Sequence, residues 1–379
     1  MADKWITLWG NSISCDKFSP SNYAKNITLR YIATTTISGE IIRLKFSNVY
    51  GYEDVKLTKV TVGVVDSENT VSDIKTVTFS NNESVVINKG KYLYSDHIKL
   101  SIKSSDKIAV SIYLGDYTDM HSAIKITGPI SKFQFTVGDF SLNPAFDPAL
   151  SDVTDVVYFL EDIDVLSKAE NKAAIIFGDS ISAQSWPEWL ILRLIDEKRD
   201  DISVVRRAVS GSRVLREYKN LSLIRYAHAG IKRFEDDICS VCGADRVFVF
   251  HGINDIIHPC EGELFRPISD LPTAKELVDG YKQYIETAHK HGLKIYIATI
   301  TPFMGCGDQV VDREDLRQEV NEWIKTNTIA DGYIDFSSAI SDPLTGDKLL
   351  KKYDSGDHLH PSLEGGKALA LSVPYEYLK

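Results

Sequence analysis

The sequence is poor in cysteine, in excess positive charge and in long hydrophobic runs, and each shortage disfavours a class of protein. Its 379 residues include five scattered cysteines, an odd number that favours reduced thiols over a disulfide framework. The formal charge of −10 at pH 7 disfavours a surface that tracks nucleic-acid phosphates. Because no run of about 18 apolar residues occurs, no membrane-spanning helix is predicted.

The sequence also has few cysteines or histidines at the spacings that are typical of metal sites. Cys239 and Cys242 form a single CxxC, but a structural zinc site needs about four ligands and no second pair is present. Packing thiols are therefore the preferred interpretation, and we expect no metal and no cofactor. Asp3 and Lys4 lie where a signal peptide needs an unbroken apolar stretch, so we expect a cytoplasmic protein without a membrane or nucleic-acid partner.

The first half of the chain has the pattern of an all-β domain. From residue 1 to about 168, short runs such as 27–36, 40–51 and 107–115 alternate apolar and polar residues. Gly, Asn, Asp and Ser separate these runs, as is typical of strands joined by turns. The pattern predicts an antiparallel β-sandwich or jelly roll as the first of two domains.

The pattern changes after residue 171. Buried β-like runs alternate with helical stretches from there to residue 379, which predicts an α/β domain whose parallel sheet is covered by helices on both faces. Such a sheet binds ligands beyond the carboxyl ends of its strands. The expected strands are 173–179, 201–209, 245–252, 294–300 and 331–336, and the expected helices are 185–198, 274–292 and 313–327.

Polar residues suited to acyl transfer follow three of these strands. Ser180 lies in GDSIS after the first strand, Asn254 lies in GIND after the third, and Asp357 and His360 lie in DHLHP after the fifth. A serine needs a base to take its proton, and an imidazole needs an acceptor to fix its tautomer. The spacing of Asp357 and His360 can place a carboxylate beside the ring. A histidine base predicts activity that rises through about pH 6 to 7.

These blocks, with AVSGS between the first two, resemble those of the SGNH hydrolases, the superfamily of GDSL-type esterases and lipases. The resemblance covers the second half of the chain and implies a flavodoxin-like three-layer α/β/α fold and a metal-independent serine esterase. It implies that Ser180 is the nucleophile, His360 the base and Asp357 its partner. It further implies an oxyanion hole formed by the N–H groups of Ser180 and Gly211 and the side-chain amide of Asn254.

The second block departs from the family pattern, because 206–208 replaces the usual Asn-x-Gly lead-in. The arginines near this block, including Arg213, are expected to be solvated or ion-paired, although Arg213 is also a candidate for binding an anionic group of the substrate. Thr301 and Phe303 follow the fourth strand and are candidates for lining an acyl pocket. Trp186 is a further candidate for substrate binding or, alternatively, part of a core stripe.

Two alternative residues compete with the preferred catalytic pair. GNSIS at 10–14 nearly repeats GDSIS, but Asn11 replaces the aspartate and the segment lies in the β-rich half, so we expect Ser12 to be a turn serine. His358 is the alternative base. Ser180 itself has a second possible role, which is to cap the following helix.

Residues 26–65 resemble the β-sandwich domain that precedes the catalytic domain in a subset of bacterial GDSL hydrolases. A jelly roll of this kind is similar to carbohydrate-binding modules, which hold sugars on exposed aromatic side chains. Here such side chains could instead fill the core or a domain interface. The available aromatics are Trp5, Trp9, Tyr50, Tyr52, Tyr92 and Tyr94.

Three functions remain open on sequence grounds. The first is an esterase that removes small acyl groups, acetyl above all, from an acylated oligosaccharide or another small ester. The second is a lipase or arylesterase, disfavoured because no strongly apolar lid segment is visible between Asn254 and Ala274. The third is a non-catalytic carbohydrate-binding protein. The sequence leaves the oligomeric state open.

Overall fold

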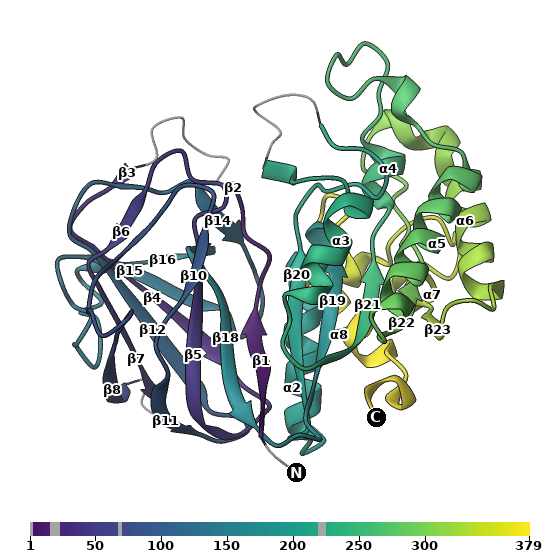
Figure 1. Ribbon diagram of the computed structural model, residues 1–379. Coiled ribbons are helices and arrows are strands. Elements are labelled where there is room, and N and C mark those ends of the chain that lie inside the picture. Colours follow the sequence, from purple (N-terminus) through teal and green to yellow (C-terminus); the bar gives the residue numbers. More distant parts are fainter. Residues whose placement is uncertain (1–2, 16–22, 67–69, 219–224) are drawn as a thin grey trace. The chain divides into compact units, whose positions relative to one another are not determined.

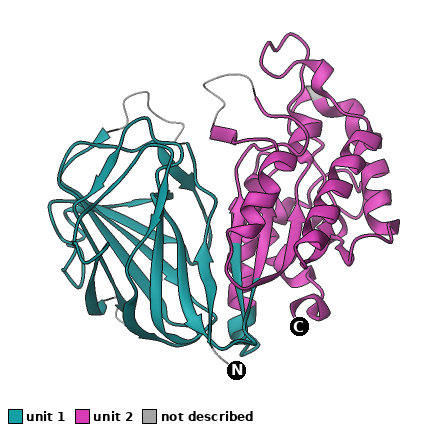
Figure 2. Cartoon of the chain, viewed as in Figure 1, with its two compact units in different colours: residues 1–173, 194–205 teal, residues 174–193, 206–379 magenta. Residues whose placement is uncertain are grey.

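The computed structural model describes residues 3–15, 23–66, 70–218 and 225–379. The chain divides into two compact units, one of residues 1–173 and 194–205 and the other of residues 174–193 and 206–379 (Figure 2). We expected one uninterrupted second domain from residue 171, and that boundary stays a prediction. Within the described ranges, no helix is long and apolar enough to cross a bilayer.

The first unit is an antiparallel β-sandwich, as the alternating pattern predicted (Figure 1). Its strands are β1 (Lys4–Gly10), β2 (Ser14–Cys15), β3 (Tyr23–Ala24), β4 (Ile27–Thr34), β5 (Gly39–Ser47), β6 (Val55–Leu57), β7 (Lys59–Val65), β8 (Val71–Val77), β9 (Val85–Ile87), β10 (Tyr92–Tyr94), β11 (Ile98–Ile102), β12 (Lys107–Leu114), β13 (Thr118–Asp119), β14 (Ser122–Lys125), β15 (Lys132–Val137), β16 (Ser151–Thr154), β17 (Val156–Tyr158) and β18 (Leu160–Ser167). One large sheet has the order β1–β18–β5–β10, with β11 also paired to β5. The other has the order β16–β15–β4–β12–β7–β8.

The sequence pattern did not predict β1 or β18, which pair from Lys4 and Ser167 to Gly10 and Asp162, with one irregularity after Thr7. The reason is that β18 carries acidic residues inside the sheet, which the alternation rule reads as solvent-facing. Asp164 is buried, where it accepts a hydrogen bond from Thr7 Oγ1 at 2.7 Å and pairs with Arg43 Nε at 2.9 Å. Buried carboxylates are tolerated when they are paired in this way.

The expected parallel sheet is present, and it belongs to the second unit except for residues 172–173 and 202–205, which the division assigns to the first. Its strands are β19 (Lys172–Gly178), β20 (Ile202–Ala208), β21 (Ala244–Phe250), β22 (Lys294–Ala298) and β23 (Gly332–Ile334). They lie in the order β20–β19–β21–β22–β23, and the β21–β22 and β22–β23 pairs are parallel. The carboxyl ends of these strands therefore meet at one rim, where the sequence placed the polar blocks.

Helices cover the sheet in two groups. They are α1 (Ser180–Ala183), α2 (Trp186–Asp196), α3 (Gly230–Cys239), α4 (Ile253–Ile257), α5 (Ala274–Lys290), α6 (Glu314–Thr326), α7 (Phe336–Ile340) and α8 (Leu363–Ser372), with short 3-10 turns at Ile268–Asp270, Asp308–Arg313, Lys351–Tyr353 and Tyr375–Leu378. Phe177 of β19 packs on Phe234 of α3 and Tyr284 of α5. On β21, Phe250 instead packs on Phe336 of α7, which also contacts Trp186 of α2. The unit is thus an α/β/α arrangement.

Helices α2, α5 and α6 fall within the stretches predicted from sequence, whereas α3 and α8 were not predicted. Half of the ten residues of α3 are charged, and one of them, Arg233, is buried beside Phe234, so few apolar residues mark the inner face of this helix. In α8 two consecutive glycines lower the helix propensity. A Cβ atom at Gly366 would lie 2.0 Å from Ser185 Oγ, so close packing explains that glycine.

Candidate active site

Ser180 is the first residue of helix α1, and only Asp179 separates it from the end of strand β19. Strand β19 ends at Gly178, and the side chain of Asp179 caps α1 by accepting a hydrogen bond from Ile181 N at 3.1 Å. The role of helix cap belongs to Asp179, so that alternative for Ser180 is wrong. The Ser180 hydroxyl is therefore not committed to capping.

The structure brings Ser180 together with His360 and Asp357. Ser180 Oγ lies 2.8 Å from His360 Nε2, and His360 Nδ1 lies 2.6 Å from Asp357 Oδ2. Because an ionised carboxylate can only accept, Nδ1 carries the proton in this pair and leaves Nε2 of the neutral ring free to accept the serine proton. This hydrogen-bonded chain can move a proton from the serine to the imidazole.

The carboxylate of Asp357 is held by several donors. Its Oδ1 accepts hydrogen bonds from the backbone N–H groups of Leu359 at 3.0 Å and His360 at 2.8 Å, and from Ser355 Oγ at 3.0 Å. Partial burial raises the pKa of Asp357, but the hydrogen bonds from the backbone and ring of His360 outweigh it and lower the pKa to about 2. Asp357 is thus ionised at neutral pH and can stabilise an imidazolium.

His358 forms a separate pair with a different aspartate. Its Nδ1 lies 2.6 Å from Asp354 Oδ2, and its backbone has a positive φ of 60°. The two histidines thus have different partners: His360 bonds to the serine, and His358 bonds to an aspartate four residues before it. This arrangement favours His360 over His358 as the base.

The second block forms a turn near the end of β20. Gly211 has a φ of +80°, and the next residue, Ser212, donates its N–H to Val209 O at 3.1 Å. Asn254 Nδ2 donates to Ser212 O at 3.0 Å, which ties the third block to the second. The amide nitrogen carries a second hydrogen, which is the one available to an oxyanion. Gly211 and Asn254 are therefore linked through Ser212.

Buried residues that sequence reasoning missed connect these blocks. His251 Nε2 lies 3.0 Å from Ser212 Oγ and its Nδ1 lies 3.1 Å from Tyr284 Oη, while burial lowers its pKa to about 3. Arg233 donates to Gly178 O at 2.9 Å and to Ser212 Oγ at 3.3 Å. Two features of the sequence could have indicated these residues. Arg233 lies among the apolar residues of a helix, and His251 lies directly before GIND.

Aromatic residues enclose Gly211. Tyr218 Oη donates to Gly211 O at 3.2 Å and also hydrogen-bonds with His258 Nδ1. A Cβ atom at Gly211 would lie 2.3 Å from the Tyr226 ring, so a larger residue would displace that ring as well as strain the backbone. Burial lowers the pKa of His258 to about 3, which keeps its ring neutral. These contacts fix the position of the predicted oxyanion residue.

Four residues predicted to bind substrate are buried in this structure, and their role stays a prediction. Trp186 and Arg213 are 1% exposed, and Thr301 and Phe303 are 0% exposed. Trp186 packs on Phe336, which matches the core-stripe alternative. Arg213 pairs with Asp270 at 3.1 Å and lies over the Tyr218 ring, so it is ion-paired as the first interpretation held. Apolar size and position after a strand do not distinguish a pocket wall from core.

The near copy of the serine motif lies in the antiparallel unit. Gly10 ends β1, the N–H of Asn11 donates to Glu161 O at 2.9 Å, and the Ser12 side chain is buried. No cluster of three or more His, Cys, Asp or Glu side chains in the described part of the chain could hold a metal ion.

A parallel sheet with a serine, histidine and aspartate hydrogen-bonded in series at its rim is the arrangement that a hydrolase of esters can use. The chain belongs to the GDSL-like lipase/acylhydrolase family, whose model matches residues 176–368. The match spans all four sequence blocks.

Solved structures similar to the chain include a GDSL-like lipase from Bacteroides thetaiotaomicron, at 14% identity over 53% of this chain and 85% of that one, with a TM-score of 0.39. They also include an acetylxylan esterase from Geobacillus stearothermophilus, at 19% identity over 54% of this chain and 94% of that one, with a TM-score of 0.41. No curated protein sequence matches the chain.

Proposed function

We propose that this acylhydrolase is a metal-independent serine esterase whose nucleophile is Ser180. The observation that carries the proposal is the chain of contacts from Ser180 Oγ to His360 Nε2 and from His360 Nδ1 to Asp357. Ser180 Oγ attacks the ester carbonyl carbon while His360 takes the hydroxyl proton. The carbonyl oxygen becomes an oxyanion that accepts hydrogen bonds from the N–H groups of Ser180 and Gly211 and from the amide of Asn254.

Collapse of this intermediate breaks the bond to the leaving alcohol, which takes the proton from His360 and leaves an acyl group on Ser180. Water then attacks the acyl-enzyme with His360 as base, and the carboxylic acid departs. Asp357 stabilises the imidazolium in both steps because its carboxylate accepts from Nδ1 throughout.

For the substrate we propose small acyl groups, acetyl above all, on an oligosaccharide. The sequence resemblance of the β-sandwich to carbohydrate-binding modules supports the sugar, and the net charge of −10 supports a neutral substrate. The test is acetate release from an acetylated xylo- or manno-oligosaccharide beside p-nitrophenyl acetate, with wild type and Ser180→Ala. Loss of both activities in the variant supports both assignments. Cleavage of the aryl ester alone by the wild type would refute the sugar assignment and leave the serine mechanism standing.

One observation favours esters of longer acids as a second candidate. The loop after α4, in which the sequence showed no strong lid segment, exposes Leu264 by 81%, Phe265 by 45% and Ile268 by 42%. Leu264 and Phe265 line a pocket of about 470 Å³ with Leu215. A chain-length series of p-nitrophenyl esters separates the two candidates: an optimum at acetate supports the acetylesterase, and an optimum at octanoate supports this second function.

A further inference from the structure

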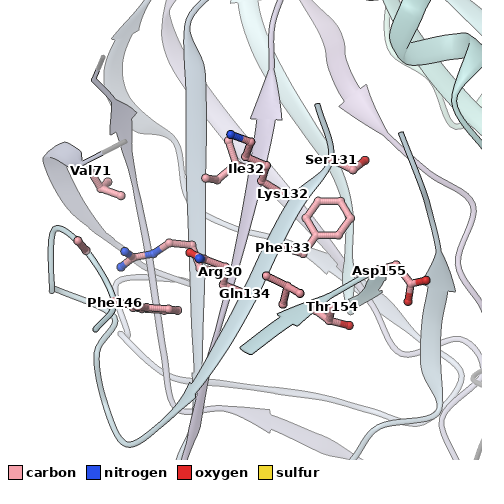
Figure 3. Close-up of a pocket in the computed structure, with 12 residues that line it drawn as sticks. Arg30, Ile32, Val71, Ser131, Lys132, Phe133, Gln134, Phe146, Thr154 and Asp155 are labelled. Atoms are coloured by element: carbon pink, nitrogen blue, oxygen red, sulfur yellow. The ribbon is translucent and has the colours of Figure 1, made fainter. Parts of the chain in front are cut away.

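A pocket of about 860 Å³ lies in the β-sandwich unit, over the six-stranded sheet. Strand register places several of its lining residues on one face: Gln134 of β15 pairs with Arg30 of β4 and Val153 of β16, and Lys132 pairs with Ile32. Directly paired residues point to the same side of a sheet. Figure 3 shows Lys132 beside Ile32, and the guanidinium of Arg30 beside the ring of Phe146. The volume suits a small-molecule ligand.

The lining of this pocket carries unbalanced positive charge. Arg30 is buried, and its hydrogen-bond partners are all neutral: Ser111 Oγ at 2.8 Å and the carbonyl oxygens of three residues in the loop 140–144. No carboxylate contributes to its pKa, which burial lowers to about 10. Four of its five N–H donors are used, which leaves one on Nη1 without a partner among the described residues.

Lys132 adds a second cation, because it forms no ion pair within the part of the chain that the structure describes and its side chain is exposed. The carboxylate in the lining is Asp155, and Lys125 neutralises it at 2.8 Å. The two cations Arg30 and Lys132 thus remain without a carboxylate in the lining to neutralise them. Because the chain as a whole has a net charge of −10, this local positive charge favours an anionic ligand.

The remaining lining combines neutral hydrogen-bonding groups with apolar surface. Gln134 offers an amide, while Ile32 and Val153 offer aliphatic surface on the same face, with Val153 80% exposed. An amide beside aliphatic groups matches a ring that has hydroxyls on its edge and C–H groups on its face. A bare inorganic anion would leave the apolar part of the lining unused.

We propose that this pocket binds a sugar acid, a hydroxylated ring that carries a carboxylate, with Lys132 facing the carboxylate and Gln134 the ring hydroxyls. The site is separate from the serine site and requires no ester, so the proposal does not depend on the esterase mechanism. It assigns the β-sandwich a specificity for acidic oligosaccharides, in contrast to the neutral substrate that we propose for the serine.

The test is isothermal titration calorimetry of the full chain with three ligands: an unesterified trigalacturonate, a neutral trisaccharide and inorganic phosphate. We expect the uronate to bind at least about tenfold more tightly than the neutral sugar, and the difference to shrink in about 0.5 M salt as the charges are screened. Lys132→Met should weaken uronate binding by about tenfold, because it removes the exposed cation and keeps the aliphatic stem.

The matched control is Lys103→Met, which removes an exposed lysine from a turn outside the lining and should leave binding within about twofold. Gln134→Leu should weaken both sugars at unchanged melting temperature, which separates lost hydrogen bonds from lost folding. The proposal is overturned if wild type fails to bind uronate, if the neutral sugar or phosphate binds as tightly, or if Lys132→Met and Lys103→Met behave alike.

Discussion

Two segments of this chain, GNSIS at 10–14 and GDSIS at 178–182, differ by one residue yet lie in unlike surroundings. The first follows an antiparallel strand, and its Ser12 side chain is buried. The second follows a parallel strand, and there Asp179 caps the helix while Ser180 Oγ meets His360 Nε2 at 2.8 Å. The comparison teaches that the motif alone provides only a serine hydroxyl. In our account the hydroxyl becomes a nucleophile because it lies at the end of a parallel strand, within hydrogen-bonding distance of His360.

The most forceful way to break this comparison is to remove each serine in turn. Ser180→Ala should lower kcat/KM for p-nitrophenyl acetate by about 10⁴- to 10⁶-fold, since the variant retains only binding and oxyanion stabilisation. Ser12→Ala should leave kcat/KM within about twofold, because Ser12 has no role in the chemistry. Steady-state kinetics on both variants check this. Comparable losses of kcat/KM in the two variants would contradict the assignment of Ser180, and not Ser12, as the nucleophile.

A similar comparison separates the two histidine–aspartate pairs. Asp357→Asn should lower kcat by about 10⁴-fold, because the amide no longer fixes the tautomer of His360 or stabilises its cation. His358→Asn should change kcat by less than about threefold, and asparagine tolerates the positive φ at this position. If the loss instead followed His358→Asn, the pairing of Ser180 with His360 would not be the catalytic one.

Removing the side-chain donor sharpens the assignment of the oxyanion hole. Asn254→Ala should lower kcat by about 10²- to 10³-fold with KM nearly unchanged, since the amide acts on charge that develops in the transition state. A matched control is Asn321→Ala: Asn321 is also buried and donates Nδ2 to a backbone carbonyl, that of Ile300, at 2.9 Å. This control should lower the melting temperature while kcat stays within about threefold. Equal effects of the two variants on kcat would make Asn254 merely structural.

The smallest effect concerns stability and comes from a buried ring beside the second block. Burial lowers the pKa of His251 to about 3 from 6.5, so the unfolded chain binds more protons at this group than the native chain between these pH values. The contribution of the neutral His251 ring to the free energy of unfolding is fully present above pH 6.5 and is lost as the pH falls below it. We expect His251→Asn to abolish about 2 kcal/mol of the loss in unfolding free energy between pH 6.5 and 5.

Denaturant titrations of wild type and His251→Asn at the two pH values measure this difference. Asn321→Ala provides the control, because it removes no titratable group and should leave the pH dependence as it is in the wild type. A wild-type stability with the same pH dependence as that of His251→Asn would show that the ring is not held neutral.

The sequence predicted the fold where patterns are periodic and missed it where charge enters the interior. The five strands of the parallel sheet and helices α2, α5 and α6 follow from β-branched runs and apolar spacing. Strand β18 and helix α3 were missed because Asp164 and Arg233 lie buried on faces that the rules expect to be apolar. Asp164 pairs with Arg43 of a distant strand, and Arg233 donates to the distant Gly178 O besides pairing with Asp237 on its own helix. A local pattern cannot show the distant partners.

The residues of the proposed catalytic site stand out in the sequence more clearly than the residues around them. Short motifs at strand ends indicated Ser180, Asn254 and His360, since the rim of a parallel sheet gathers such ends. The substrate-binding candidates Thr301 and Phe303 rested on position alone, and both are buried. Whether a side chain after a strand turns into the core or into a pocket depends on helix packing that the sequence does not display.

The most direct test of the central claim is covalent trapping of the nucleophile. The full chain is incubated with a p-nitrophenyl alkylphosphonate, which transfers its phosphonyl group to an activated serine, and the peptides are mapped by mass spectrometry. The account predicts one adduct, on Ser180, with release of one equivalent of nitrophenol, and none in Ser180→Ala or in His360→Asn. An adduct on Ser12, or labelling that persists in Ser180→Ala, would contradict it.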